Sequence, residues 1–574
     1  MPTLDLLLSD LTFLYGEETG RTTLRRIESL VEHHRLRIPP QPFSRLSQRD
    51  AVLICYGDQV SQAGEAPLRT LANFCSQHLP GLVNSVHILP FYPYSSDDGF
   101  SVIDYRSVDA QLGSWEDVAM LGQRFNLMFD AVINHISRQS DWFQGFLAGD
   151  LHYQNYFIEV KGNPDLSKVA RPRTLPLLTQ FSTTRGEKAI WTTFSEDQID
   201  LNYQNPEVLV EILDLLLTYA QKGAKFIRLD AIAYLWKEIG TACIHLPQTH
   251  AVIRIMHGLL EKAAPQVRLI TETNVPHEAN MSYFGDGTNE AHLIYNFALP
   301  PLVLYSLQKG DSTRLSAWAG SLSLPSKQVT FFNFLASHDG IGVMPLSGII
   351  PGEEIEMLAS RTLTQGGLVS DRSNPDGSKS PYELNINYFD ALANPELDEL
   401  LETQVDRFCA AHAIQLAILG VPGIYFHSLF GSRGWPEGVR SSGRNRSINR
   451  QKLTLAELEA DLSDPSSLRS RIFRRIALLL RKRASHPAFD PYGEQRMVDC
   501  DPRIFGLLRS APGGSEQLLC LQNLSARPVT MDLSKMAVAW RSKTATDLIS
   551  GEQLTVTSGT QLNLRPYQTL WLEL

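Results

Sequence analysis

The sequence contains few cysteines, and their arrangement argues against two common ways of stabilising a fold. Only six cysteines occur among 574 residues, with no CxxC pair and no metal-ligand spacing to a histidine. Scattered cysteines of this kind fit reduced thiols in a cytoplasmic protein better than a disulfide scaffold or a zinc site. We therefore expect a cytoplasmic location.

An excess of basic residues and long apolar runs are also missing. The net charge is −10 and the pI is near 5.9, which argues against nucleic acid or an anionic membrane surface as the main partner. No apolar run reaches the length of a bilayer span, and the first residues lack the basic segment of a signal peptide. Hydrophobic and charged contents of 43% and 20% are ordinary for a soluble globular protein.

Glycine-rich phosphate-binding turns are missing as well. The segment "CYGDQVSQAGEAP" (55–67), which includes the turn after the first predicted strand, contains neither GxGxxG nor GxxxxGK[ST]. These turns bring backbone N–H groups to the phosphates of a nucleotide. Their absence argues against a doubly wound nucleotide-binding enzyme.

Short apolar segments alternate with helical stretches along most of the chain. The pattern predicts eight strands, at residues 51–57, 85–90, 127–135, 224–231, 268–274, 293–299, 330–339 and 423–430. Strands that alternate with helices pair in parallel, in an open doubly wound sheet or in a closed barrel. Because eight is the number of the (β/α)8 TIM barrel, we predict an α/β fold of that class.

The alternation is interrupted twice and ends before the C-terminus. Long polar segments rich in Pro and Gly follow the third and seventh predicted strands, which suggests insertions. From about residue 490, short β-like runs replace the helical periodicity. We predict a helical extension (1–48), a barrel in three parts (49–136, 200–339 and 396–489), inserted domains (137–199 and 340–395) and an antiparallel β-domain (490–574).

Polar residues gather where the predicted strands end, which is where active sites lie in such barrels. Each has an ordinary structural explanation, such as a turn cap, a core histidine or a salt bridge. Several unpaired carboxylates at the same end of a barrel destabilise the fold, however, so their joint placement there indicates a function. The residues are Asp97, Asp98, Asn134, His135, Arg228, Asp230, Tyr234, Glu272, His338 and Asp339.

Three of these acids suit the cleavage of a glycosidic bond, which needs one carboxylate to attack and one carboxyl to protonate the leaving oxygen. Arg228 should favour the ionised form of Asp230, as a nucleophile requires. Neighbouring carboxylates should raise the pKa of Glu272, as a proton donor requires. Asp339 is then available to stabilise positive charge on the sugar ring.

Four segments resemble, in order, the characteristic motifs of the α-amylase clan: "DAVINH", "FIRLDAIAY", "LITE" and "FLASHD". Further segments resemble the sucrose phosphorylase branch of that clan, among them "NFALPPLVLYSL" and "GRNRSINR". The N-terminal extension and "SSDDGFSV" are most similar to the glucosylglycerate phosphorylases. The resemblance implies a (β/α)8 barrel and a double displacement with retention of configuration. It also implies no metal, because the clan's calcium-binding pattern is not evident and this branch does without the metal, and no other cofactor; inorganic phosphate is a substrate.

Roles follow from the matched positions. The resemblance implies that Asp230 is the nucleophile, Glu272 the general acid/base and Asp339 the transition-state stabiliser. Residues expected around the donor sugar are Asp97, Phe100, His135, Phe194, Gln198, Arg228 and His338. Residues expected around phosphate and acceptor are Arg173, Tyr234, Tyr382, Glu383 and Arg446.

Phosphate is an anion, and it must reach a site surrounded by carboxylates. At ~4 Å and an effective dielectric of ~20, each unscreened charge pair is worth roughly 4 kcal/mol, so the site needs cations. Arg173 and Arg446 offer guanidinium forks that fit phosphate. A hydrolase or transglucosylase would share the three acids, whereas a non-catalytic sugar-binding protein would be expected to lose one of them.

The acceptor is less defined than the donor. Ser380 and Glu383 stand where the sucrose-specific pattern has Asp and Gln, which makes sucrose doubtful and leaves room for an anion such as glycerate. The glycerate carboxylate would want a cation, for which Arg433, Arg444 and His427 are candidates. Sucrose, sucrose 6-phosphate and glucosylglycerol remain alternatives. The expected partners are these small molecules, with no nucleic acid and no membrane.

Overall fold

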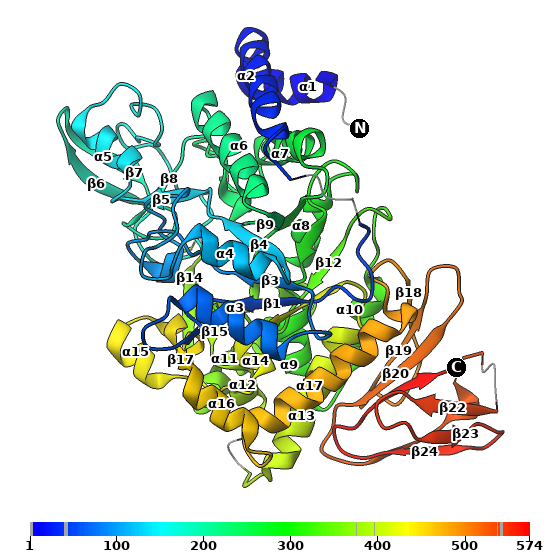
Figure 1. Ribbon diagram of the computed structural model, residues 1–574. Helices are drawn as coiled ribbons and strands as arrows, with labels where there is room; N and C mark the ends of the chain where they lie inside the picture. The colour runs from blue at the N-terminus through cyan, green and yellow to red at the C-terminus, as the bar shows by residue number, and fades with distance from the viewer. Residues whose placement is uncertain (1–3, 40–43, 375, 395–396, 537, 540–542) are drawn as a thin grey trace.

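Eight parallel strands close into a barrel at the centre of the molecule (Figure 1). The computed structural model describes residues 4–39, 44–374, 376–394, 397–536, 538–539 and 543–574. Around the barrel the order is β1-β16-β12-β11-β10-β9-β4-β3. The bounds are β1 (Val52–Cys55), β3 (Ser85–Ile88), β4 (Asn126–Ala131), β9 (Ala224–Leu229), β10 (Arg268–Thr271), β11 (Leu293–Tyr295), β12 (Thr330–Asn333) and β16 (Val421–Tyr425).

All eight strands fall within or overlap the predicted segments, and the predicted fold class is confirmed. Several strands are shorter than the sequence predicts. The segment 423–430 leaves the sheet at Tyr425 and continues as helix α14 (Phe426–Leu429). In the segment 127–135, the barrel strand ends at Ala131, and His135 begins β5 (His135–Ser137), which pairs with β8 (Gln198–Asp200). Apolar character continues past these strand ends because the loops above the barrel are buried too.

Helices cover the outside of the barrel. Helix α6 (Pro206–Gln221) shows how the sequence specifies one: the Asn205 side chain accepts from the Glu207 N–H, Pro206 occupies the first turn, and the apolar face is buried. None of the helices within the described ranges is long and apolar enough to cross a membrane. The other principal helices are α3 (Pro67–His78), α4 (Trp115–Gly122), α7 (Pro247–Ala263), α9 (Leu299–Lys309), α10 (Thr313–Ser321), α13 (Leu401–Ala417) and α17 (Leu468–Ser485).

Two insertions lie at the carboxyl ends of the strands. The first holds α5 (Asp141–Ala148), the hairpin of β6 (Leu178–Thr183) and β7 (Gly186–Trp191), and β8. The second holds α11 (Gly352–Thr364), α12 (Tyr388–Leu392) and a small sheet of β13 (Ile341–Gly342), β15 (Lys379–Asn385) and β14 (Leu368–Ser373).

The C-terminal part is an antiparallel β-domain beside the barrel (Figure 1). A six-stranded sheet runs in the order β18-β19-β20-β25-β22-β23, and β21 (Val529–Asp532) pairs with β24 (Gln561–Leu564). The bounds in the larger sheet are β18 (Glu494–Met497), β19 (Ile504–Ser510), β20 (Gln517–Asn523), β22 (Thr544–Asp547), β23 (Gln553–Thr555) and β25 (Thr569–Glu573).

Two N-terminal helices, α1 (Leu4–Tyr15) and α2 (Glu17–Arg35), pack on α6 and α7 (Figure 1). Leu7, Leu11 and Ile27 are buried in that contact. Arg254 on α7 lies 2.6 Å from Asp10, and His34 lies 2.8 Å from Asp214 on α6. The extension is therefore attached to the barrel helices by apolar burial and by ion pairs.

Candidate active site

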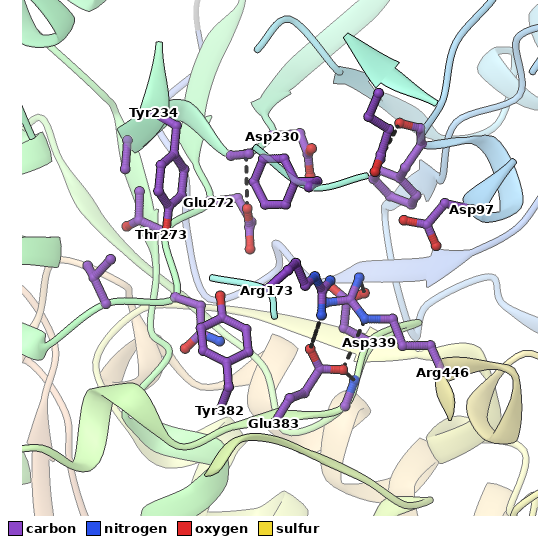
Figure 2. A pocket seen from close by; sticks show the side chains of 18 of the residues that line it. Asp97, Arg173, Asp230, Tyr234, Glu272, Thr273, Asp339, Tyr382, Glu383 and Arg446 are labelled. Atoms are coloured by element: carbon purple, nitrogen blue, oxygen red, sulfur yellow. Dashed lines mark hydrogen bonds and ion pairs between the residues drawn. The ribbon is translucent and has the colours of Figure 1, made fainter. Parts of the chain in front are cut away.

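A pocket opens at the carboxyl ends of the barrel strands and brings together the three acids of the predicted triad (Figure 2). Asp230 follows β9, Glu272 follows β10 and Asp339 comes from the loop after β12. The predicted substrate-binding residues that line the same pocket are Asp97, Phe100, His135, Arg173, Phe194, Gln198, Tyr234, His338, Tyr382, Glu383 and Arg446. Only Arg228 lies beneath the lining, inside β9.

Arg228 is ionised inside a buried strand because it lies among acids on three sides. Its guanidinium donates to Asp130 on β4 and, at 2.9 Å, to Asp230. Asp130 in turn lies 2.6 Å from the ring of His87 on β3. Since these strands are neighbours in the barrel, a buried row of His87, Asp130 and Arg228 supports the proposed nucleophile from below.

Burial raises the pKa of Asp230, and the positive charge of Arg228 offsets this only in part. Arg228 does favour the ionised form of Asp230, as expected, but the cost of burying the carboxylate outweighs the ion pair, so the pKa of Asp230 is raised. Burial also raises the pKa of Glu272, opposed by Arg228 and assisted by Asp339, as expected for the proton donor.

Asp230 and Glu272 interact, so they take up protons as a pair. Arg228 lies 2.9 Å from Asp230 but 3.9 Å from Glu272, so a single shared proton is favoured on Glu272. Glu272 is also held by the backbone N–H of Ala231, which donates to it at 3.1 Å from a left-handed turn (φ 49°). One ionised and one protonated carboxyl is the state that retaining glycoside chemistry requires.

A strained loop holds Asp97 at one end of the pocket. Asp97 and Asp98 both have left-handed backbones (φ 54° and 55°), and Gly99 passes so close to Pro90 that a Cβ atom there would lie 2.5 Å from its carbonyl oxygen. Burial alone would raise the pKa of Asp97, but nearby guanidinium groups, with Arg450 the strongest, lower it to about 2. The carboxylate of Asp97 is therefore ionised and fixed in place.

Aromatic rings and amide groups form the wall next to Asp97. Phe100 stacks on His338 with ring centroids 4.6 Å apart. His135 lies 2.9 Å from the carbonyl oxygen of Phe100, and Gln198 donates to the same oxygen at 3.0 Å. Phe194 contacts the His135 ring at 5.3 Å. The predicted sugar-binding residues thus form one connected surface.

Two guanidinium groups lie next to Asp339 and Glu383 (Figure 2). Arg446 is 2.5 Å from Asp339 and forms a bidentate pair with Glu383, at 3.0 and 2.6 Å. Arg173 lies 3.9 Å from Glu383 and stacks over the Tyr382 ring at 5.9 Å (Figure 2). Glu383 therefore offsets part of the positive charge that we expected to be available for phosphate.

All three residues suggested as cations for glycerate lie outside the pocket lining. Arg433 pairs with Asp390 at 2.7 Å, and His427 is buried against Ser432, where burial lowers its pKa to about 3. Arg444 lies 3.5 Å from Asp97, with nearly half of its side chain exposed. These placements leave Arg173 and Arg446 as the guanidinium groups of the pocket lining.

Sequence reasoning missed several charged residues around the pocket. Arg450 lies 3.4 Å from Asp97 and 3.6 Å from Asp339, and its Nε donates to the His338 carbonyl. Arg450 could have been found from the sequence, because it is the last arginine of the motif "GRNRSINR". Asp130 is the first residue of the motif "DAVINH", but only the fold shows that Arg228 is its neighbour.

No group of three or more His, Cys, Asp or Glu side chains is placed to hold a metal ion in the part of the chain that is described. Beside His135, the ammonium group of Lys237 lies 2.5 Å from Asp200 and 2.8 Å from the Asn134 oxygen. This buried cluster is therefore neutralised by a side chain of the protein itself.

The barrel and its acidic pocket define a glycoside enzyme of the α-amylase type. Residues 79–344 match the family described as alpha amylase, catalytic domain, and residues 496–571 match the maltogenic amylase C-terminal domain. The chain aligns with the crystal structure of sucrose 6F-phosphate phosphorylase from Thermoanaerobacter thermosaccharolyticum with a TM-score of 0.72 and 28% identity, over 84% of this chain and 94% of that one.

Comparison with curated relatives identifies the family of the chain within this clan. It is 47% identical to the glucosylglycerate phosphorylase of Spirochaeta thermophila over 100% of this chain and 99% of the relative. It is 42% identical to that of Escherichia coli over 98% of each chain. Identity to the sucrose phosphorylase of Agrobacterium vitis is 32%, over 76% of this chain and 88% of the relative. The chain belongs to the glucosylglycerate phosphorylase family, within the sucrose phosphorylase branch.

Proposed function

We propose that this enzyme catalyses the reversible phosphorolysis of 2-O-α-glucosylglycerate to α-glucose 1-phosphate and glycerate. The observation that carries the proposal is that Asp230, Glu272 and Asp339 share one pocket with the guanidinium groups of Arg173 and Arg446. The acids suit glucosyl transfer, and the cations suit an anionic acceptor. The names of the full-length relatives support the choice of substrate.

In the first step, the Asp230 carboxylate attacks C1 of the glucosyl unit and forms a covalent β-glucosyl ester. Glu272 gives its proton to the glycosidic oxygen, so that glycerate leaves with a neutral hydroxyl group. Positive charge that develops on the ring is stabilised by Asp339. The raised pKa of Glu272 favours its protonated form, as a proton donor requires.

In the second step, a phosphate oxygen attacks C1 from the face that glycerate left, and the Asp230–C1 bond breaks. A phosphate proton passes to Glu272, which restores the starting state. Two inversions give net retention, so the product is the α-anomer. For phosphate to approach, Arg446 must exchange part of its contact with Glu383 and Asp339 for contact with the incoming anion.

The pocket must open for substrates to bind. Its cavity measures about 70 Å³, smaller than the roughly 300–1,000 Å³ of most ligand sites. Arg173, Tyr382, Glu383 and Arg446 come from loops of the two insertions and of the last barrel segment. We propose that these loops move apart to admit the disaccharide, that no cofactor takes part, and that the enzyme works in the cytoplasm.

The proposal is tested in the direction of synthesis. Purified enzyme is given α-glucose 1-phosphate with glycerate, glycerol, fructose or fructose 6-phosphate at equal concentration, and phosphate release is measured. We expect glycerate to give the highest rate, and NMR to show a retained α-linkage. A higher rate with fructose would refute the acceptor assignment, and phosphate-independent cleavage of the glucoside would refute phosphorolysis.

A further inference from the structure

A second cavity adjoins the active site on the side of Tyr234 and Tyr382. It measures about 620 Å³ and shares four lining residues with the catalytic pocket, namely Tyr234, Asn274, Val275 and Tyr382. Tyr234 and Tyr382 lie at the end of the pocket opposite Asp97 (Figure 2). The second cavity is therefore next to the acceptor end of the site and away from the residues that bind the glucosyl unit.

The charge of this outer cavity differs from that of the protein as a whole. Lys168, Arg171 and Arg372 line it, and none of the described residues in its lining is Asp or Glu. His245 also lines it, but burial lowers the pKa of His245 to about 4, so its ring is neutral at pH 7. In a chain with net charge −10, a cavity whose charged lining residues are all cations attracts anions.

These cations form no close ion pairs with acids among the described residues. Arg171 donates to the carbonyl oxygen of Leu175, and the Nε of Arg372 donates to the Ser380 hydroxyl at 3.1 Å. Neither arginine, nor Lys168, forms an ion pair with an acid within the described residues. The acids nearest to them in sequence, Asp165, Asp371 and Asp376, are exposed and do not line the cavity.

The cations continue into the catalytic pocket. Arg173 is two residues from Arg171 on the same loop and lines the inner pocket beside Tyr382. Arg446 lies further in, next to Asp339. Positive charges thus extend from the outer cavity, through Arg173, to Arg446 beside Asp339 in the catalytic pocket.

We propose that Lys168, Arg171 and Arg372 form a capture site for small oxyanions, through which phosphate, glycerate and α-glucose 1-phosphate reach Asp230 and Glu272. The inference rests on the proposed function, since all three of these reactants are anions. With Glu272 protonated, four other acidic residues, Asp97, Asp230, Asp339 and Glu383, outnumber the two guanidinium groups of Arg173 and Arg446 in the inner-pocket lining, which therefore repels anions from solution. The outer cations offset that repulsion and raise the local concentration of anions at the pocket.

Position 380 is part of the same site. Because the partner of Arg372 is the Ser380 hydroxyl, the arginine keeps its full charge for a ligand. An aspartate at position 380 would pair with Arg372 and cancel that charge. The residue at this position therefore sets whether the outer cavity attracts an anionic or a neutral acceptor.

The first test removes single charges with Lys168→Gln, Arg171→Gln and Arg372→Gln. We expect each variant to raise the KM for phosphate and for glycerate about three- to tenfold, with kcat within about twofold of the parent. The dependence of kcat/KM on ionic strength should become weaker. Hydrolysis of α-glucosyl fluoride, in which both donor and acceptor are uncharged, should keep its rate.

Two further variants separate charge from local structure. Arg372→Lys retains the charge and loses the planar group that bonds Ser380, and we expect it to keep the parent KM values within about twofold. Ser380→Asp keeps Arg372 but supplies a neutralising partner, and we expect it to reproduce the KM increase of Arg372→Gln. Glycerol as acceptor should be affected by neither variant.

The matched control is Arg49→Gln. Arg49 is exposed and directly precedes the first barrel strand, so it lies at the opposite end of the barrel from the pocket. If Lys168→Gln, Arg171→Gln and Arg372→Gln all leave the KM for phosphate and glycerate as Arg49→Gln does, the capture site is refuted while phosphorolysis stands. If only the glycerate KM changes, the cavity is an acceptor site and the capture of phosphate is refuted. A parent enzyme that does not use phosphate would refute the proposed function itself.

Discussion

The guanidinium group of Arg446 lies 2.5 Å from the carboxylate of Asp339. The same guanidinium also forms a bidentate pair with Glu383. A cation thus lies between the proposed transition-state stabiliser and the acceptor loop. An anionic acceptor that binds there competes with Glu383 for Arg446, and this competition connects phosphate binding to movement of the loop.

Arg446→Ala should impair phosphorolysis far more than hydrolysis. The loss of a charge-assisted contact to phosphate costs roughly 1.5–3 kcal/mol, about ten- to a hundredfold in kcat/KM. Arg446→Lys should recover little, because it provides a charge without the planar fork. The measurement is kcat/KM for phosphate beside the rate of α-glucosyl fluoride hydrolysis. Equal losses in the two reactions would show that Arg446 acts on the glucosyl transfer and not on phosphate.

Asp230→Asn should lose nearly all turnover with every donor, because the amide cannot form the glucosyl ester. Glu272→Gln should lose most activity with glucosylglycerate and least with α-glucosyl fluoride, whose leaving group needs no proton. The rates with the two donors are compared for each variant. Similar losses with both donors in Glu272→Gln would remove Glu272 from the role of the acid.

Glu272→Gln should also change how stability depends on pH. The folded-state pKa of Glu272 is raised above its usual 4.5, so the parent protein binds this proton more tightly when folded. Its contribution to stability is present below pH 4.5 and is lost as the pH rises through the folded-state pKa. The glutamine side chain has no proton to lose, so the variant does not lose stability in this way. The free energy of unfolding of the variant minus that of the parent should therefore increase from pH 5 to pH 8.

Denaturant unfolding at several pH values measures this difference. Glu18→Gln removes the same charge from the exposed part of α2 and serves as the control. A difference that is equal at pH 5 and pH 8, or an increase that Glu18→Gln shares, would contradict the raised pKa of Glu272.

Asp130→Asn should destabilise the fold strongly, because it removes one of the carboxylates that pair with the buried guanidinium of Arg228. Breaking a buried ion pair from one side costs about 3–5 kcal/mol. Asp406→Asn breaks the pair with the partly exposed Arg475 and should cost about 1 kcal/mol or less. Chemical unfolding of both variants provides the comparison. Equal small costs would show that Asp230 alone is enough to neutralise Arg228.

The strands and the triad followed from short-range patterns in the chain. Runs of apolar residues such as those at 52–55 and 224–229 marked strands because a parallel barrel buries both faces of each strand. Asp230, Glu272 and Asp339 were recognised because each follows such a strand within a characteristic motif. The ends of the strands were predicted less well, since the buried loops above the barrel are also apolar.

Local sequence determined that this protein is a (β/α)8 barrel with acids at the carboxyl ends of its strands, because apolar periodicity and strand-end residues are properties of neighbouring positions. Only the tertiary structure decided which charge pairs with which. Arg228 meets Asp130 across 98 residues, Arg446 meets Glu383 across 63, and the Arg450 guanidinium approaches the Asp97 carbonyl oxygen across 353. Such pairs decide pKa values and the charge left free for ligands, since electrostatic interactions depend on distance in space and on burial rather than on separation along the chain.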